Sequence, residues 1–209
     1  MIRILHSAGT ALAAVLCCTS CTLFSPEPDP TRYAVLAAVD ELPDAARTST
    51  AATHLTVGLG PIVVPEYLLN LEMQSRTEGT RLVPSTTERW GEPLDRGLER
   101  VLAIDLKRAL GAERIVLHPW YATESPDVQV RITFTRFERA DAGKVVVRAT
   151  WSVLRASSDA PLVERETRLE RATNGEDGAS AALALSFALA DLASEIAAAW
   201  SEAPPDALP

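Results

Sequence analysis

Cysteine and histidine side chains bind metals and act as nucleophiles or bases, so their positions limit the chemistry open to this chain. Its three cysteines, Cys17, Cys18 and Cys21, all lie near the N-terminus. A disulfide framework, a zinc site built on cysteine pairs and a cysteine nucleophile are therefore excluded from the rest of the chain. After Cys21 only His54 and His118 remain, and no HxxxH or HExxH spacing joins histidines that could share an ion. We expect no metal site.

Other catalytic motifs are also missing from the sequence. Gly58-Leu59-Gly60 begins like a phosphate-binding turn, but Pro61 follows and no Gly-Lys-Ser/Thr appears. There is no GxSxG elbow for a serine nucleophile. Glu164 and Glu166 alternate with arginines, a pattern typical of charge pairing on a solvated strand rather than of acid–base catalysis. We expect no catalytic residues, and we predict that the chain is not an enzyme.

The balance of charge argues against nucleic acid as a partner. The 209 residues include 20 Lys and Arg against 28 Asp and Glu, a formal net charge of -8, whereas binding to a phosphate backbone needs a positive surface. Hydrophobic residues make up 47% of the chain, which suits one globular domain with a single core.

The N-terminal residues have the pattern of a bacterial lipoprotein signal. Arg3 precedes an apolar stretch over residues 8–18 that is too short to span a bilayer comfortably. It ends in Cys18-Thr19-Ser20-Cys21, which resembles the lipobox at which such signals are cleaved and the new N-terminal cysteine is acylated. We predict a signal peptide over residues 1–20 and a covalent lipid on Cys21, with no other cofactor. Cys17 and Cys18 are the alternative lipid sites, and an ordinary cleaved signal with incidental cysteines is the alternative to lipidation.

The residues after the signal predict a tether and a place in the cell envelope. Residues 21–32 carry proline at every second position from Pro26 to Pro30, which is typical of an extended, semi-rigid linker. Thr22 rather than Asp follows the predicted anchor, and by resemblance to lipoprotein sorting rules this favours the outer membrane, at its periplasmic face. We expect one folded domain over residues 33–201 and a flexible tail over residues 202–209.

Alternation of apolar and polar residues predicts several strands. Phe137 lies out of phase with Phe134, which predicts a bulge or strand end near Thr135 and Arg136. Residues 162–171 are polar on both faces, as an edge strand would be. The predicted strands cover residues 55–59, a hairpin within 71–82, and residues 115–117, 128–135, 145–153 and 162–171.

Two helices complete the predicted fold. Pro93 and Gly111 delimit a helix over residues 93–110. Residues 179–200 are apolar except for serines, Asp191 and Glu195, and those two acids favour a helix on the sheet over a membrane span. We predict an α+β fold, a mostly antiparallel sheet with two main helices packed together on one face.

Six short motifs in this order resemble a known family, the ABC-type transport auxiliary lipoproteins (PqiC-like), over nearly the whole mature domain, from Tyr33 to Trp200. Each motif alone is weak, but their order and spacing behind a lipobox are fairly specific. The motifs are Tyr33-Ala34-Val35-Leu36, Val64-Pro65-Glu66-Tyr67-Leu68, Trp90-Gly91-Glu92-Pro93-Leu94, His118-Pro119-Trp120, Arg136-Phe137-Glu138 and Ala182-Leu183-Ala184-Leu185.

The resemblance implies a function that composition cannot supply. Proteins of this family resemble the outer-membrane component of transport systems built around MCE-domain proteins, which move lipids or other hydrophobic molecules between membranes. It implies a non-catalytic docking role, an MCE-domain (PqiB-like) protein as partner and, because such assemblies are rings, a homo-oligomer. The alternatives are a structural envelope lipoprotein and a lipid-binding carrier independent of an MCE system.

Candidate partner contacts are Pro65, Tyr67 and Leu68, because an aromatic side chain beside a proline turn makes a rigid anchor. The alternative is that Tyr67 packs on its own domain.

Overall fold

A computed structural model describes residues 28–41, 53–121, 123–140, 143–155 and 160–202. The predicted signal, Cys21, most of the tether and all but the first residue of the predicted tail lie outside these residues. The described residues from Thr31 onward form one compact unit, to which the following description applies.

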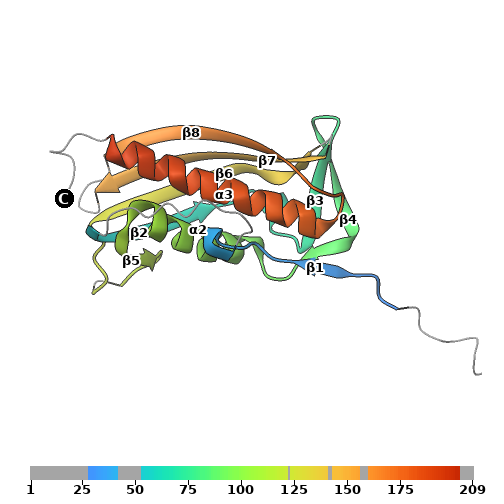
Figure 1. The fold of residues 1–209 in the computed structure, drawn as a ribbon, viewed down its shortest axis with the longest axis horizontal. Helices are drawn as coiled ribbons and strands as arrows, with labels where there is room; N and C mark the ends of the chain where they lie inside the picture. Colours follow the sequence, from blue (N-terminus) through green and yellow to red (C-terminus); the bar gives the residue numbers. More distant parts are fainter. Residues whose placement is uncertain (1–27, 42–52, 122, 141–142, 156–159, 203–209) are drawn as a thin grey trace, which may run out of the picture. The chain divides into compact units, whose positions relative to one another are not determined.

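The described residues of this unit form a mixed sheet of eight strands with helices on one face (Figure 1). Along one path the strand order is β1-β4-β3-β6-β2-β5, and β7 and then β8 extend the sheet from the other side of β6. The strands are β1 (Arg32–Ala34), β2 (Thr53–Val63), β3 (Glu72–Thr77), β4 (Arg81–Trp90), β5 (Ala112–Leu117), β6 (Val128–Ala140), β7 (Lys144–Arg155) and β8 (Pro161–Ala172).

The long ladders of this sheet are antiparallel, which confirms the predicted class of sheet. They join β6 to β7, β7 to β8 and β3 to β4. Shorter parallel ladders join β2 to β5 and β6, β3 to β6, and β1 to β4. As predicted, β8 is an edge strand, since it pairs only with β7.

The predicted bulge is present in β6, where the register shifts between Phe134 and Arg136. Because of this extra residue, Phe134 and Phe137 both face the core, each 1% exposed, with their rings in edge contact at 5.6 Å. The same shift turns Arg136 and Glu138 to the opposite face of the sheet, whereas an unbroken alternation from Phe134 would bury them under the helices.

Two long helices, α2 (Leu94–Leu110) and α3 (Gly178–Ser201), pack against each other and on the same face of the sheet. Pro93 precedes α2, and Gly111 ends it in the left-handed conformation, at φ 62°. Asp177 caps α3 by accepting a hydrogen bond from Ser180 N at 2.7 Å. Two single-turn 3-10 helices, η2 (Val39–Glu41) and η3 (Glu66–Leu68), lie between strands.

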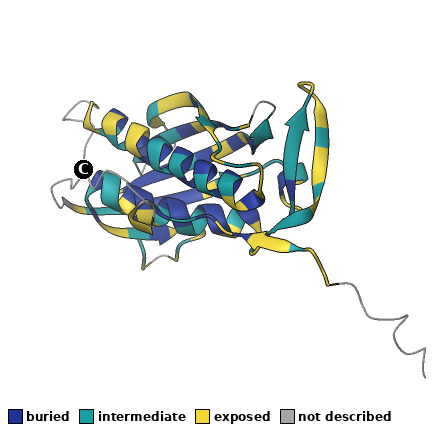
Figure 2. Ribbon diagram, turned by 45° about the vertical axis from the view of Figure 1, so that its right-hand side comes forward, coloured by how far each residue is buried: buried dark blue, intermediate teal, exposed yellow. Residues whose placement is uncertain are grey.

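Figure 2 shows that the buried residues gather where the helices meet the sheet. Helix α3 is long and apolar enough to cross a membrane, but its apolar side is used in this core. Its two acids face β8: Arg171 Nε donates to Asp191 at 2.8 Å, and Thr167 donates to Glu195 at 2.6 Å. The fully buried side of α3 includes Ala181, Leu185, Ala188, Leu189, Leu192 and Ile196.

We expect Thr167→Val to destabilise the domain by about 1–2 kcal/mol. Thr167 is 6% exposed and accepts a hydrogen bond from Trp151 Nε1 at 2.9 Å, so valine would leave a buried indole N–H without its acceptor. Thermal unfolding followed by circular dichroism measures the change. Thr150→Val is the matched control, since Thr150 is exposed on β7 and its loss should change stability by less than about 0.5 kcal/mol. Equal shifts in the two variants would contradict this role of Thr167.

Candidate functional site

The predicted contact residues lie in the segment that joins β2 to β3. Pro65 precedes η3 and is partly buried. Leu68 packs in the core with 3% of its surface exposed, and Tyr67 is a partly buried residue packed against the same core. Their role in binding a partner stays a prediction, as does the lipidation of Cys21.

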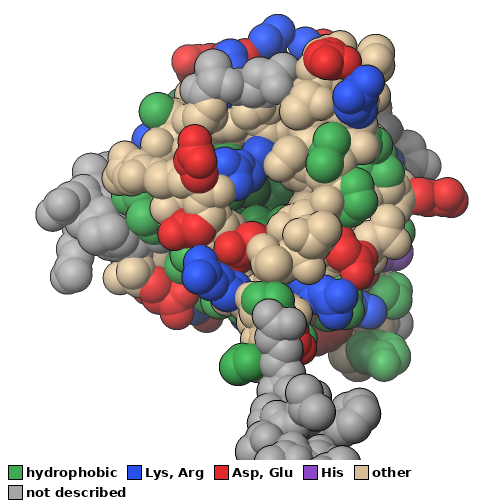
Figure 3. All heavy atoms as spheres, turned by 90° about the vertical axis from the view of Figure 1, so that its right-hand side faces the viewer, with side chains coloured by type: hydrophobic (Ala, Val, Ile, Leu, Met, Phe, Trp, Pro, Cys, Tyr) green, Lys and Arg blue, Asp and Glu red, His purple; other side chains and the backbone are tan. Residues whose placement is uncertain are grey.

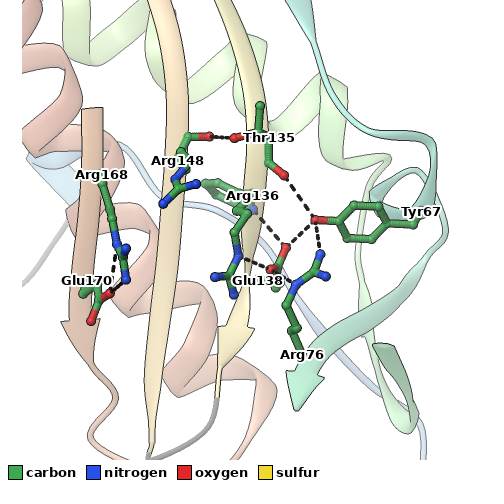
Figure 4. Close-up of polar contacts among 9 residues, drawn as sticks. Tyr67, Arg76, Thr135, Arg136, Glu138, Arg148, Arg168 and Glu170 are labelled. Atoms are coloured by element: carbon green, nitrogen blue, oxygen red, sulfur yellow. Dashed lines mark hydrogen bonds and ion pairs between the residues drawn. The ribbon is translucent and has the colours of Figure 1, made fainter. Parts of the chain in front are cut away.

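The hydroxyl of Tyr67 enters a group of four polar side chains, Tyr67, Arg76, Arg136 and Glu138, which we call the Glu138 cluster (Figure 4). Tyr67 donates to Glu138 Oε2 at 2.6 Å and accepts from Arg76 Nη2 at 3.0 Å. Arg76 Nε and Arg136 Nε donate to Glu138 Oε1 at 2.8 and 2.7 Å. The Glu138 side chain has no exposed surface. The cluster therefore ties the η3 segment to β3 and β6.

Charge and hydrogen bonding stabilise one protonation state of this cluster. Burial alone would raise the pKa of Glu138, but hydrogen bonds from Arg76, Tyr67 and Arg136 outweigh it and hold the pKa below its ordinary value of 4.5. Burial and then the hydrogen bond to Glu138 raise the pKa of Tyr67 to about 12. The guanidinium of Arg76 also lies 5.3 Å from the centre of the Tyr67 ring. A carboxylate that stays ionised and a phenol that stays neutral suit a fixed structural contact better than proton transfer near neutral pH.

Beside this cluster, three arginines stand side by side on neighbouring strands. Arg136 of β6 is directly opposite Arg148 of β7, and Arg148 is directly opposite Arg168 of β8. All three lie on the face of the sheet opposite α2 and α3, which we call the open face. We call Arg136, Arg148 and Arg168 the arginine row. Figure 4 shows the row together with the nearby Thr135, Glu138 and Glu170.

One part of the open face is covered by the loop after β5. Trp120 and Pro126 lie over Gly58 of β2, and a Cβ added at Gly58 would be 2.9 Å from Trp120 Cζ3. His118 contacts Trp120 edge to face, with ring centres 5.3 Å apart. The His118-Pro119-Trp120 motif thus closes the β2 side of the open face, whereas Arg148 and Arg168 keep 39% and 55% of their side chains exposed.

The end of the unit formed by β1 and the β3–β4 hairpin mixes charged and hydrophobic side chains (Figure 3). Leu69 and Leu71, one and three positions after the last predicted contact residue, Leu68, are 47% and 46% exposed. Tyr33 of β1 and Val83 of β4 are also exposed, at 65% and 43%. Exposed leucines next to η3 make this segment a better contact surface than Leu68 itself.

Sequence reasoning did not identify Arg76 as a neighbour of the predicted segment, or Arg148 and Arg168 as members of a row with Arg136. The bulge predicted near Thr135 is the sequence signal that places Arg136 on the open face. The positions of Arg76, Arg148 and Arg168 beside Arg136 depend on which strands pair. Among the described residues, no group of three or more His, Cys, Asp and Glu side chains is placed to hold a metal ion.

Comparisons with known proteins identify the family. Two solved structures share the fold: an uncharacterised protein, with 19% identity, a TM-score of 0.62 and coverage of 73% of this chain and 96% of that one, and protein XCC0632 from Xanthomonas campestris, with 16% identity, a TM-score of 0.62 and coverage of 81% and 92%. No curated protein matches the sequence. The model of the family described as "ABC-type transport auxiliary lipoprotein component" matches residues 40–197. The chain therefore belongs to the ABC-type transport auxiliary lipoprotein family, whose members are lipoproteins that assist a transport system.

Proposed function

We propose that this lipoprotein is anchored by Cys21 at the periplasmic face of the outer membrane and acts as the non-catalytic docking component of an MCE-type ABC transport system. Its cargo would be lipids or other hydrophobic molecules that move between the membranes. The observation that carries the proposal is the family match over residues 40–197, combined with the lipobox-like Cys18-Thr19-Ser20-Cys21.

The layout of the chain supports a docking role. A lipid on Cys21 and a proline-rich linker would hold the domain at the membrane while leaving it free to meet the distal end of an MCE-domain assembly. The contact surface we propose is the segment around Pro65, Tyr67 and Leu68, extended by the exposed Leu69 and Leu71. Several copies of the lipoprotein around the ring of the partner would match its symmetry.

The test is affinity purification of the full-length protein from detergent-extracted membranes of its own host, with mass spectrometry of the proteins that co-purify. We expect an MCE-domain protein among them. A Leu69→Asp, Leu71→Asp variant should lose this partner, because charge is placed in the proposed contact. Ile104→Asp on α2 is the matched control, since Ile104 is also an exposed aliphatic residue, at 36%, and lies on the helix side.

Each other result points to a different function. Purification without any MCE-domain protein would contradict the docking role. If deletion of this protein damages the cell envelope but leaves lipid transfer between the membranes unchanged, a role as a structural envelope lipoprotein is favoured. A carrier that binds lipid by itself should co-purify with lipid even when the partner is absent.

A further inference from the structure

The arginine row departs from the usual pattern of sheet pairing. Directly opposite residues of neighbouring strands have Cβ atoms about 4.5–5.5 Å apart, and like charges in such positions repel. Here Arg148 of β7 has an arginine on each side: Arg136 on β6 and Arg168 on β8. A sequence that keeps such a row loses stability in the free protein, and local conflicts of this kind are typical of functional surfaces.

The outer members of the row have carboxylate partners on their own strands. Arg136 donates to Glu138 at 2.7 Å, and Arg168 pairs with Glu170. Each of these carboxylates is shared with a second cation, because Glu138 also pairs with Arg76 and Glu170 also pairs with Lys144 at 2.6 Å. Both carboxylates therefore already pair with two cations each, and neither forms an ion pair with Arg148.

The central Arg148 is the least satisfied member. The residues two positions away on its strand are Val146 and Thr150, so no carboxylate flanks it there. Its nearest acid is Glu166 on β8, with Oε1 3.6 Å from Arg148 Nε, which is longer than a hydrogen bond. The Nε atom is buried and has no hydrogen-bond partner in the described part of the chain, while 39% of the side chain remains exposed.

The row and its neighbours form a local excess of positive charge on a chain with a net charge of -8. Counting the ion pairs of the described residues, three carboxylates serve five cations. The carboxylates are Glu138, Glu166 and Glu170, and the cations are Arg76, Arg136, Lys144, Arg148 and Arg168. Such a patch attracts an anionic partner, and guanidinium groups bind carboxylates through paired hydrogen bonds.

The shape of the patch favours an acidic protein segment over a membrane surface. Glu166, with 63% of its side chain exposed, is opposite Thr150 and so lies off the row. A continuous anionic bilayer could not avoid this carboxylate, whereas a single helix lying along the row can. Val146, the apolar residue between Glu138 and Glu170, is 2% exposed and cannot insert into lipid. Acidic side chains one turn apart on a helix have Cβ atoms about 5–6 Å apart, which matches the spacing of arginines on neighbouring strands.

We propose that the arginine row is a docking surface for an acidic helix of a partner protein, with carboxylates one turn apart, and that Arg148 is its central contact. This surface is distinct from the contact at Leu69 and Leu71, and the inference does not depend on the identity of the transport system. A partner carboxylate would accept hydrogen bonds from the exposed Nη end of the Arg148 guanidinium, since the buried Nε is out of a partner's reach.

The test uses full-length protein in a nonionic detergent and a fluorescein-labelled, alanine-based helical peptide with three glutamates four residues apart. We expect binding by fluorescence anisotropy that weakens as salt rises. Arg148→Gln should weaken binding about tenfold or more, because a charge-assisted contact is lost, and Arg148→Lys should give an intermediate loss. A peptide with glutamine at the three positions should not bind.

Arg96→Gln on α2 is the matched control, since Arg96 is an exposed arginine with one partner, Glu99 at 2.9 Å, on the helix side. It should bind the peptide like the unchanged protein. Arg148→Gln should also unfold at a temperature equal to or above that of the unchanged protein, because repulsion within the row is relieved. The proposal is overturned if Arg148→Gln binds normally, if Arg96→Gln loses binding to the same extent, or if phosphatidylglycerol vesicles bind through Arg148 while the peptide does not.

Discussion

A Cys21→Ala variant of the full chain is expected to lose all incorporation of labelled palmitate. Acylation requires the sulfur of the cysteine that becomes the new N-terminus, and in the sequence this cysteine is the last of the lipobox-like Cys18-Thr19-Ser20-Cys21. One acyl chain gives only marginal membrane binding, whereas two or more give stable anchoring. Metabolic labelling, together with mass spectrometry of the N-terminal peptide, measures the modification directly.

Cys17→Ala and Cys18→Ala are the matched controls, because each removes a thiol from the same segment while leaving Cys21 in place. Both should still be labelled. Label retained by Cys21→Ala but lost in one of the other two would move the lipid to that cysteine. A chain that carries no lipid in any form would remove the basis for membrane anchoring, on which the proposed function rests.

Local signals in the sequence were enough to predict both long helices and most of the strands, but not β1 or the full length of β4. Pro93 and Gly111 marked the ends of α2 because proline is tolerated before a first turn and glycine adopts the left-handed end of a helix. Alternation of apolar and polar residues predicted the long hairpin of β6 and β7. The phase change between Phe134 and Phe137 predicted the bulge within β6. Each of these signals spans only a few residues.

Strand pairing could not be predicted in the same way. Nothing local indicates that β2 lies parallel to both β5 and β6, since the alternation of a strand identifies its faces but not its neighbours. For this reason Arg76 and Glu138, which are 62 positions apart, were not recognised as partners. The arginine row likewise exists only through the register that sets Arg148 against both of its neighbours.

Replacing Glu138 by glutamine is expected to destabilise the domain by about 3 kcal/mol. Glutamine keeps the size of the side chain but removes the charge that Arg76 and Arg136 share, and its amide group cannot accept from Arg76, Arg136 and Tyr67 together. The loss corresponds to a midpoint of thermal unfolding lower by about 6–12 °C for a chain of this size. Glu166→Gln is the matched control, since Glu166 is 63% exposed and its contact with Arg148 is long.

The effect of Glu138→Gln should also depend on pH. Because the pKa of Glu138 is lower in the folded than in the unfolded protein, its ionised form stabilises the fold fully above its ordinary value of 4.5. That stabilisation is lost as the pH falls through the lower, folded-state pKa. The difference in midpoint between the unchanged protein and Glu138→Gln should therefore be largest near neutral pH and shrink below pH 4.5. A difference that stays constant across this range would mean that shape rather than charge accounts for the role of Glu138 in holding η3 against the sheet.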